Sequence, residues 1–172
     1  MLASCLFLLD KERIIMNRYM QERWPWIEGT HGMRTALLDT LNDADLAFSP
    51  GGQNMTLGAL CREMGEVEYS YTQSLKTFKQ DWSYRNQEAG LESSVARLKT
   101  WFQALDEEMK AVVSALSDQD WQKMVDRNGY ATPIDFQLDV YLQALLIFLG
   151  KATVFLKAMN KPLPENFQEY IG

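Results

Sequence analysis

The 172-residue sequence has only two cysteines, one histidine and five prolines. So few prolines exclude a collagen-like chain. Two cysteines cannot form a disulfide framework, and their isolation favours a reducing compartment. The single histidine, His31, excludes most metal sites and most acid–base mechanisms that rely on imidazole. The whole sequence is 47% hydrophobic and 23% charged, and its length and composition are those of one globular domain.

Basic residues are fewer than acidic ones, 17 against 23, which gives the chain a net charge of −6. A surface of this sign does not neutralise phosphates, so we expect no nucleic-acid partner. Long hydrophobic runs are absent as well. The apolar run at residues 2–9 lacks the flanks of a secretory signal, and the run at 144–150 is far shorter than the roughly 20 residues that span a bilayer. We therefore expect a cytoplasmic protein with no membrane partner.

Apolar residues recur every three or four positions along two long segments, 56–78 and 91–116. This spacing follows one face of a helix, and the charged residues between, Asp106 among them, are expected to face solvent. A third helix is expected up to residue 159, capped by Thr132 and with Pro133 at its first position. A fourth is expected from about residue 30 or 33 to residue 41, because Pro25, Gly29 and Gly32 interrupt the sequence before it.

No segment alternates with period two for long enough to form a sheet. Four amphipathic helices of this kind bury their apolar faces only against one another, so the sequence predicts an all-α four-helix bundle. The connection at 117–131 is expected to hold a short helical piece around 118–125. We expect one domain over residues 16–172, with residues 1–15 as a peripheral N-terminal extension, because Met16 opens a stretch that is typical of a native start.

Three stretches resemble the DinB-like (damage-inducible, YfiT-like) family. They are LAFSPGGQNMTLGAL at 46–60, EMGEVE at 63–68, and GKATVFLK at 150–157 with the proline-containing tail that follows. The resemblance covers about residues 26–170 and implies an up-down-down-up bundle that is often a homodimer. It also implies a divalent metal held by three histidines, one on the second helix and two on the last, and for some members the use of low-molecular-weight thiols.

Matched to these motifs, the three histidine positions fall on Glu63, Ala144 and Phe148 of this chain. Alanine and phenylalanine do not donate to a metal, so we expect no metal cofactor. The leading interpretation is a protein that binds a small apolar or amphipathic ligand, or that acts through dimer contacts. The predicted ligand cleft is lined by Glu63, Tyr141, Ala144, Phe148 and Lys151.

The alternative interpretation is a thiol-dependent transferase or isomerase, working without metal or with an ion held by Glu63 and Glu66. The candidate catalytic residues are then Glu63, Glu66 and Tyr141, because a carboxylate in a pocket can act as a general base. Glu63 could equally be a surface acid beside the core, with Tyr141 a packed tyrosine and Lys151 a solvated lysine. His31 is expected to be a capping or surface residue.

Overall fold

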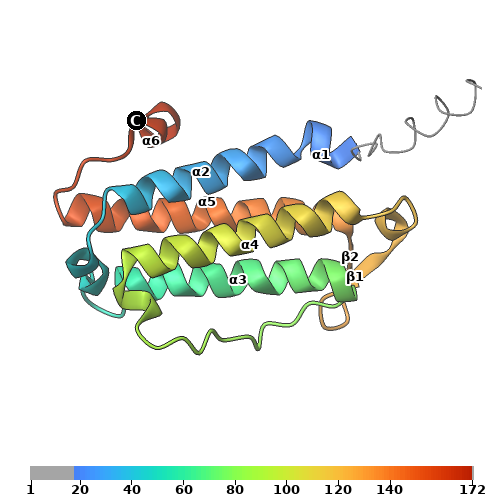
Figure 1. Ribbon diagram of the computed structural model, residues 1–172, viewed down its shortest axis with the longest axis horizontal. Coiled ribbons are helices and arrows are strands. Elements are labelled where there is room, and N and C mark those ends of the chain that lie inside the picture. Colours follow the sequence, from blue (N-terminus) through green and yellow to red (C-terminus); the bar gives the residue numbers. More distant parts are fainter. Residues whose placement is uncertain (1–17, 172) are drawn as a thin grey trace, which may run out of the picture.

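The computed structural model describes residues 18–171, and most of these are helical (Figure 1). Four long helices form a bundle: α2 (Trp24–Asp39), α3 (Leu57–Thr77), α4 (Val95–Ala115) and α5 (Ile134–Ala158). Helices α2 and α5 run in one direction, and α3 and α4 run in the other (Figure 1). The predicted up-down-down-up four-helix bundle is therefore confirmed.

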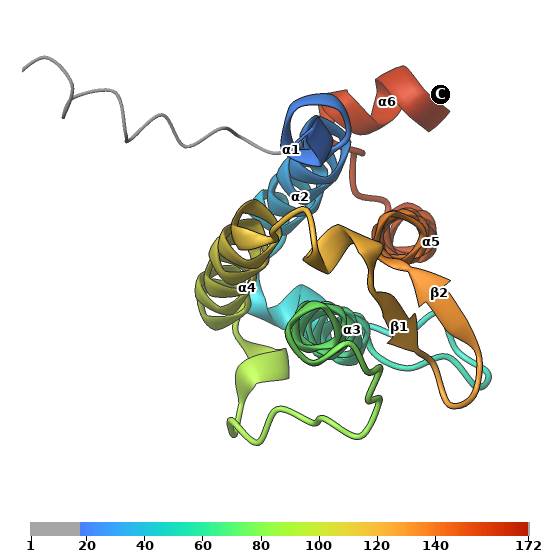
Figure 2. The ribbon, with the colours of Figure 1, turned by 90° about the vertical axis from the view of Figure 1, so that its right-hand side faces the viewer.

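Each long helix packs against two of the others around a shared core. Helix α3 packs against α4 and α5, and so does α2, which places α2 and α3 diagonally across the bundle (Figure 2). The parallel pair α3 and α4 cannot be joined by a tight turn. Residues 78–94 instead run back along the outside of the bundle and end in the short 3₁₀ helix η2 (Leu91–Ser93).

The start of α3 is fixed by a cap and by a close backbone approach. The hydroxyl of Thr56 accepts a hydrogen bond from the Ala59 amide at 3.2 Å. Gly58 follows, and a Cβ atom at this position would lie 1.8 Å from the carbonyl oxygen of Glu92. The first turn of α3 can therefore rest directly on the backbone of η2. The 3₁₀ helix η1 (Asp43–Ala47) precedes this region.

The helix expected to begin at about residue 30 or 33 begins earlier. Helix α2 begins at Trp24, because Pro25 lies in its first turn, where the amide that proline lacks has no partner inside the helix. Gly29 and Gly32 lie within the helix and face open space, so they do not interrupt it. A short helix, α1 (Arg18–Glu22), precedes α2. The predicted peripheral extension at residues 1–15 lies outside the described residues.

The connection between α4 and α5 contains a small sheet that the sequence did not predict. After the 3₁₀ helix η3 (Asp120–Gln122), which matches the expected helical piece, strand β1 (Met124–Asp126) pairs antiparallel with β2 (Ala131–Pro133). Thr132 therefore lies in a strand opposite Val125 and does not cap the following helix. Strands of three residues are too short to produce a recognisable alternation of apolar and polar residues.

Helix α5 is the most apolar helix of the bundle. Among the described helices, it alone is long and apolar enough, by length and composition, to cross a bilayer. Its buried residues, among them Leu138 and Leu145, pack inside the bundle, and the core helix of a soluble domain passes the same test. Helix α6 (Glu165–Ile171) follows and packs against α2. We therefore interpret α5 as a core helix.

Candidate functional site

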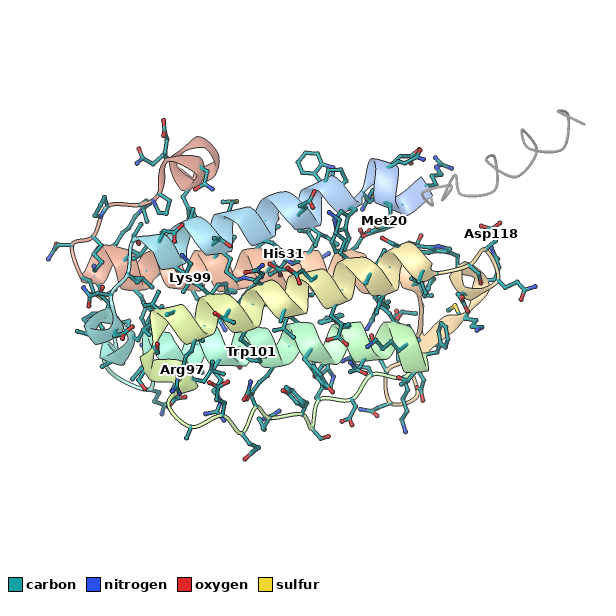
Figure 3. The ribbon with its side chains drawn as sticks, in the orientation of Figure 1. Met20, His31, Arg97, Lys99, Trp101 and Asp118 are labelled. Atoms are coloured by element: carbon teal, nitrogen blue, oxygen red, sulfur yellow. The ribbon has the colours of Figure 1, made fainter. Side chains whose placement is uncertain are left out.

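Five polar side chains meet inside the bundle, and every long helix contributes at least one of them. His31 and Arg34 come from α2, Glu68 from α3, Asp106 from α4 and Tyr141 from α5. Figure 3 labels His31 midway along the bundle. We call these five residues the central cluster. All are buried except Asp106, whose side chain is 25% exposed. Because buried charges are unfavourable unless they are paired, their contacts decide whether this arrangement is stable.

Arg34 bridges the two carboxylates of the central cluster. Its Nη1 donates to Glu68 Oε2 at 2.6 Å, and its Nη2 donates to Asp106 Oδ1. The guanidinium also stacks on Phe102, with Cζ 4.0 Å from the ring centre. Burial alone would lower the pKa of Arg34, but the charges of Glu68 and Asp106 outweigh it, and the pKa is raised above its usual value. Arg34 is therefore a permanent cation inside the core.

His31 links Asp106 to Tyr141. Its Nδ1 lies 3.0 Å from Asp106 Oδ1, and its Nε2 lies 2.7 Å from the Tyr141 hydroxyl. A carboxylate at Nδ1 favours the tautomer that carries its proton there, so Nε2 accepts from the tyrosine hydroxyl. Burial opposes ionisation of Asp106, but the hydrogen bond from His31 and the charge of Arg34 outweigh it and lower the pKa of Asp106 to about 2. Burial also raises the pKa of Tyr141 well above its usual value.

Glu68 uses only one of its two carboxylate oxygens in hydrogen bonds among the described residues. Its side chain is fully buried, and its Oε2 accepts from Arg34. Its Oε1 lies 3.8 Å from His31 Nε2 and has no hydrogen-bond partner among the described residues. Burial raises the pKa of Glu68, and the charges of Arg34 and His31 oppose this shift.

The central cluster has the donor atoms of a metal site but already contains a cation. His31, Glu68 and Asp106 can each offer one ligand atom, and these atoms lie within 4.8 Å of one another. The resemblance to the DinB-like family implies a divalent metal. Here Arg34 binds both carboxylates, so a divalent ion among them would lie beside a buried positive charge. The residues present do not fit a metal while Arg34 is in place.

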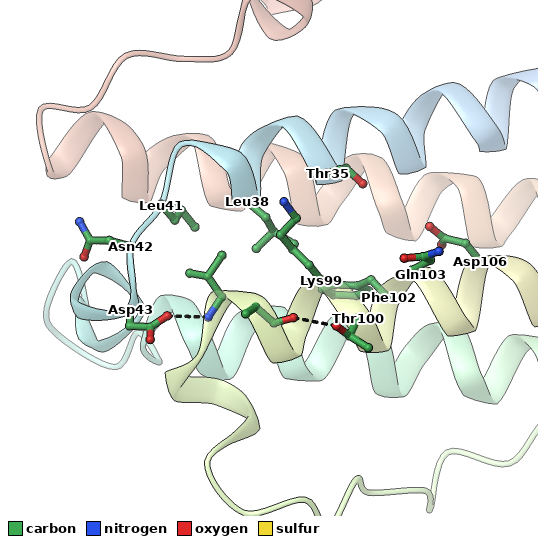
Figure 4. A pocket seen from close by; sticks show the side chains of 12 residues that line it. Thr35, Leu38, Leu41, Asn42, Asp43, Lys99, Thr100, Phe102, Gln103 and Asp106 are labelled. Carbon is green, nitrogen blue, oxygen red and sulfur yellow. Dashed lines mark hydrogen bonds between the residues drawn. The ribbon is translucent and has the colours of Figure 1, made fainter.

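A cavity between α2 and α4 reaches the central cluster from solvent. It has a volume of about 920 Å³, and its lining includes Leu38, Lys99, Phe102 and Asp106 (Figure 4). At its far end Asp43 accepts a hydrogen bond from the Val95 amide at 2.8 Å and so secures the start of α4. The carboxylate of Asp106 thus borders both the cavity and the buried cluster.

A second cavity, which we call the apolar groove, lies between α2, α5 and α6. It has a volume of about 710 Å³. Its lining residues are Pro25, Trp26, Gly29, Thr30, Met33, Leu142, Leu146, Leu149, Gly150, Asn166 and Phe167. Trp26 and Leu146 are 63% and 51% exposed, which is unusual for such large apolar side chains. Asn166 Oδ1 is buried and has no hydrogen-bond partner among the described residues.

Glu63 and Glu66 line a third cavity, on the side of α3 that faces the long connection. Glu63 is exposed, whereas Glu66 is buried and accepts from Arg62 Nε at 3.2 Å and from the Asn86 amide at 3.0 Å. Arg85 Nε lies 3.7 Å from the other oxygen of Glu66. Two guanidinium groups beside Glu66 disfavour binding of a cation here. The contacts of Glu66 with residues 85 and 86 hold the 78–94 connection against α3.

The remaining predicted cleft residues lie along α5. Phe148 is buried, Ala144 is half-buried and Lys151 is exposed, while Tyr141 belongs to the central cluster. No α5 residue lines the cavity that contains Glu63, so the structure does not bring Glu63 together with the predicted α5 residues in that cavity. A cleft shared by all five residues stays a prediction.

The prediction for His31 was wrong, because this residue lies within α2 and is only 5% exposed. The sequence did contain a signal for its two acidic neighbours. Glu68 falls between Met64 and Tyr71 at helical spacing, and Asp106 falls between Phe102 and Met109 in the same way. A carboxylate inside an apolar stripe indicates a buried polar contact more than a solvent-facing residue.

Comparisons with known proteins agree with the architecture. A model of the DinB superfamily matches residues 27–148 of the chain. Among solved structures, the DinB-like protein YjoA from Bacillus subtilis aligns with a TM-score of 0.63 at 12% sequence identity, covering 78% of this chain and 90% of that one. At this identity the likeness shows the fold alone. A search of curated proteins found no match.

Proposed function

Since this chain belongs to the DinB superfamily and has a cation of its own at the centre of the bundle, we propose that it binds a small amphipathic ligand in the apolar groove and does so without a metal. The volume of the groove, about 710 Å³, falls within the range of about 300–1,000 Å³ that is typical of small-molecule sites. Its apolar lining suits the hydrocarbon part of such a ligand.

The single observation that carries this proposal is the unpartnered oxygen of Asn166. A buried carbonyl oxygen without a hydrogen bond costs about 1–3 kcal/mol, so native proteins keep few of them. Asn166 lines the groove, and a turn of its side-chain amide would bring this oxygen to a hydroxyl or amine of a bound ligand. The ligand we propose therefore has an apolar body and one hydrogen-bond donor.

Two glycines of α2 allow a matched test of this site. Gly29 lines the apolar groove and Gly32 does not, and a Cβ atom at either position would meet nothing within 4 Å. Leucine at position 29 therefore starts from an unobstructed Cβ and extends into the groove, and leucine at position 32 adds the same side chain outside it. The probe is 8-anilinonaphthalene-1-sulfonate, whose fluorescence rises in apolar sites, with 1-decanol as the competing ligand.

We expect saturable binding of the probe and its displacement by 1-decanol. The Gly29→Leu variant should weaken binding of both by about tenfold or more, which corresponds to about 1.4 kcal/mol, while Gly32→Leu should leave it unchanged. Asn166→Leu should weaken 1-decanol by about fivefold, because one hydrogen bond is lost. Absence of saturable binding, or equal effects of the two leucines, would contradict the proposal.

We also infer that the chain forms a homodimer through the outward face of α5, as the family resemblance implies. Ile147 and Val154 are 60% and 57% exposed and lie seven residues apart, so they share one face of the helix. Neither residue lines the apolar groove itself, although Gly150, which lies between them on α5, does, so the proposed interface borders the groove. Exposed apolar residues of this kind are common at interfaces between subunits.

A further inference from the structure

We propose that the central cluster is a cation site whose cation is supplied by the chain itself, as the guanidinium of Arg34. Removal of this guanidinium should convert His31, Glu68 and Asp106 into a binding site for zinc. Zinc binding at this place does not depend on ligand binding in the apolar groove, because no residue of the central cluster lines that groove.

The donor atoms are already gathered by the fold. One imidazole and two carboxylates come from three different helices, with ligand atoms within 4.8 Å of one another. Imidazole nitrogen and carboxylate oxygen are both common zinc ligands. Glu68 Oε1 also has no partner among the described residues, although it lies in a fully buried side chain. An acceptor of this kind is available to an ion without breaking any existing hydrogen bond.

The charges of the central cluster explain why the guanidinium takes the place of an ion. Two carboxylates carry two negative charges, and Arg34 compensates one of them while binding both groups. Without Arg34 the two buried carboxylates would be uncompensated, and a proton or a cation has to balance their charge. A divalent ion supplies the two positive charges needed to balance them.

An ion has a route to this place from solvent. Asp106 is partly exposed and borders the cavity between α2 and α4, so one ligand of the set is reachable without opening the bundle. Asp106 positions His31 through Nδ1, and Nε2 becomes free to bind an ion once the Tyr141 hydroxyl turns away from it. Positioning of a ligating histidine by a second group is a regular feature of metal sites.

The test compares Arg34→Met with the wild type and with Arg34→Lys. Methionine keeps much of the arginine volume but has no charge, whereas lysine keeps a cation. After dialysis against zinc and removal of excess ion, elemental analysis should find one zinc per chain in Arg34→Met and none in the wild type or Arg34→Lys. The double variant Arg34→Met with His31→Gln should lose the bound zinc. Cobalt(II) absorption gives an independent readout of the ligand set.

Two outcomes would overturn this inference. One is a folded Arg34→Met protein, shown by its far-UV circular dichroism, that binds no zinc. The other is one zinc per chain in the wild type that is lost in His31→Gln, because the ion would then coexist with Arg34. Where Arg34→Met does not fold by itself, zinc added during refolding should restore its helical signal, and failure to do so also contradicts the inference. None of these results depends on ligand binding in the apolar groove.

Discussion

The hydroxyl of Tyr141 lies 2.7 Å from Nε2 of His31, and this hydrogen bond joins α5 to α2 inside the bundle. Both residues are buried, and neither group can exchange its partner for water. Through the other nitrogen of His31 the connection continues to Asp106 on α4. A hydroxyl, an imidazole and a carboxylate thus form one hydrogen-bonded chain across three helices.

Replacement of Tyr141 by phenylalanine should destabilise the bundle. The change leaves Nε2 of His31 without a partner in the core, and an unsatisfied buried polar group costs about 1–3 kcal/mol. Urea denaturation followed by circular dichroism measures the loss. Tyr130→Phe is the matched control, because Tyr130 is 64% exposed, and its effect should be near zero. Equal stabilities of the two variants would contradict the assigned role of the Tyr141 hydroxyl.

Acidification should remove the stability that Asp106 provides. Its pKa is about 2 in the folded chain against about 3.9 in an unfolded one, so its contribution is complete above about pH 4 and is lost as the pH falls towards 2. Glu68 acts in the opposite direction, because burial raises its pKa and its protonation on acidification favours the folded state. The Asp106→Asn variant should therefore show a flatter dependence of unfolding free energy on pH between about 4 and 2. An unchanged slope would contradict this prediction.

The two acids of the third cavity should differ in their effect on the long connection. Glu66 binds Arg62, Arg85 and the Asn86 amide, whereas Glu63 is exposed. Glu66→Gln should loosen residues 78–94 and speed tryptic cleavage after Arg85 several-fold, and Glu63→Gln should leave the rate unchanged. The early digestion products, measured by mass spectrometry, give both rates. If the two variants are cleaved alike, Glu66 is not the anchor of this segment.

Charges placed on the outward face of α5 should separate the proposed dimer. Ile147→Glu combined with Val154→Glu puts two carboxylates where a partner would bury apolar surface. Light scattering coupled to size-exclusion chromatography should report a dimer for the wild type and a monomer for this variant, with probe binding in the apolar groove retained. Tyr130→Glu, an exposed site on the hairpin loop, should leave the dimer intact. A monomeric wild type would exclude this interface.

Much of the bundle could be predicted because its helices carry regular apolar stripes. Helices α3 and α4 follow such stripes along their whole length, and Thr56 marks the beginning of the first of them. The start of α2 was missed because Pro25 and two glycines are usually found outside helices. The hairpin was missed because its strands have only three residues each and carry no period.

The central cluster could be predicted only in part. Glu68 and Asp106 each lie beside an apolar stripe, which is compatible with burial, but Asp106 was expected to face solvent, and the identity of their partners depends on how the helices are arranged. Arg34 and Asp106 are 72 positions apart in sequence, and only the packing of α2 beside α4 brings them into contact. The expected cleft residues, Glu63, Ala144 and Phe148 among them, rest on a resemblance of motifs, and motifs carry no information about which side of its helix each residue occupies.

Every long helix provides part of the central cluster, and this arrangement constrains how the protein opens. Detachment of any single helix would leave a charge or a hydrogen-bonding group without its partner in apolar surroundings. Partial unfolding of the bundle centre is therefore disfavoured. Backbone amides beside these residues should then exchange their protons with solvent only when the whole bundle unfolds. The short hairpin and α6, which lie outside this network, should exchange much sooner.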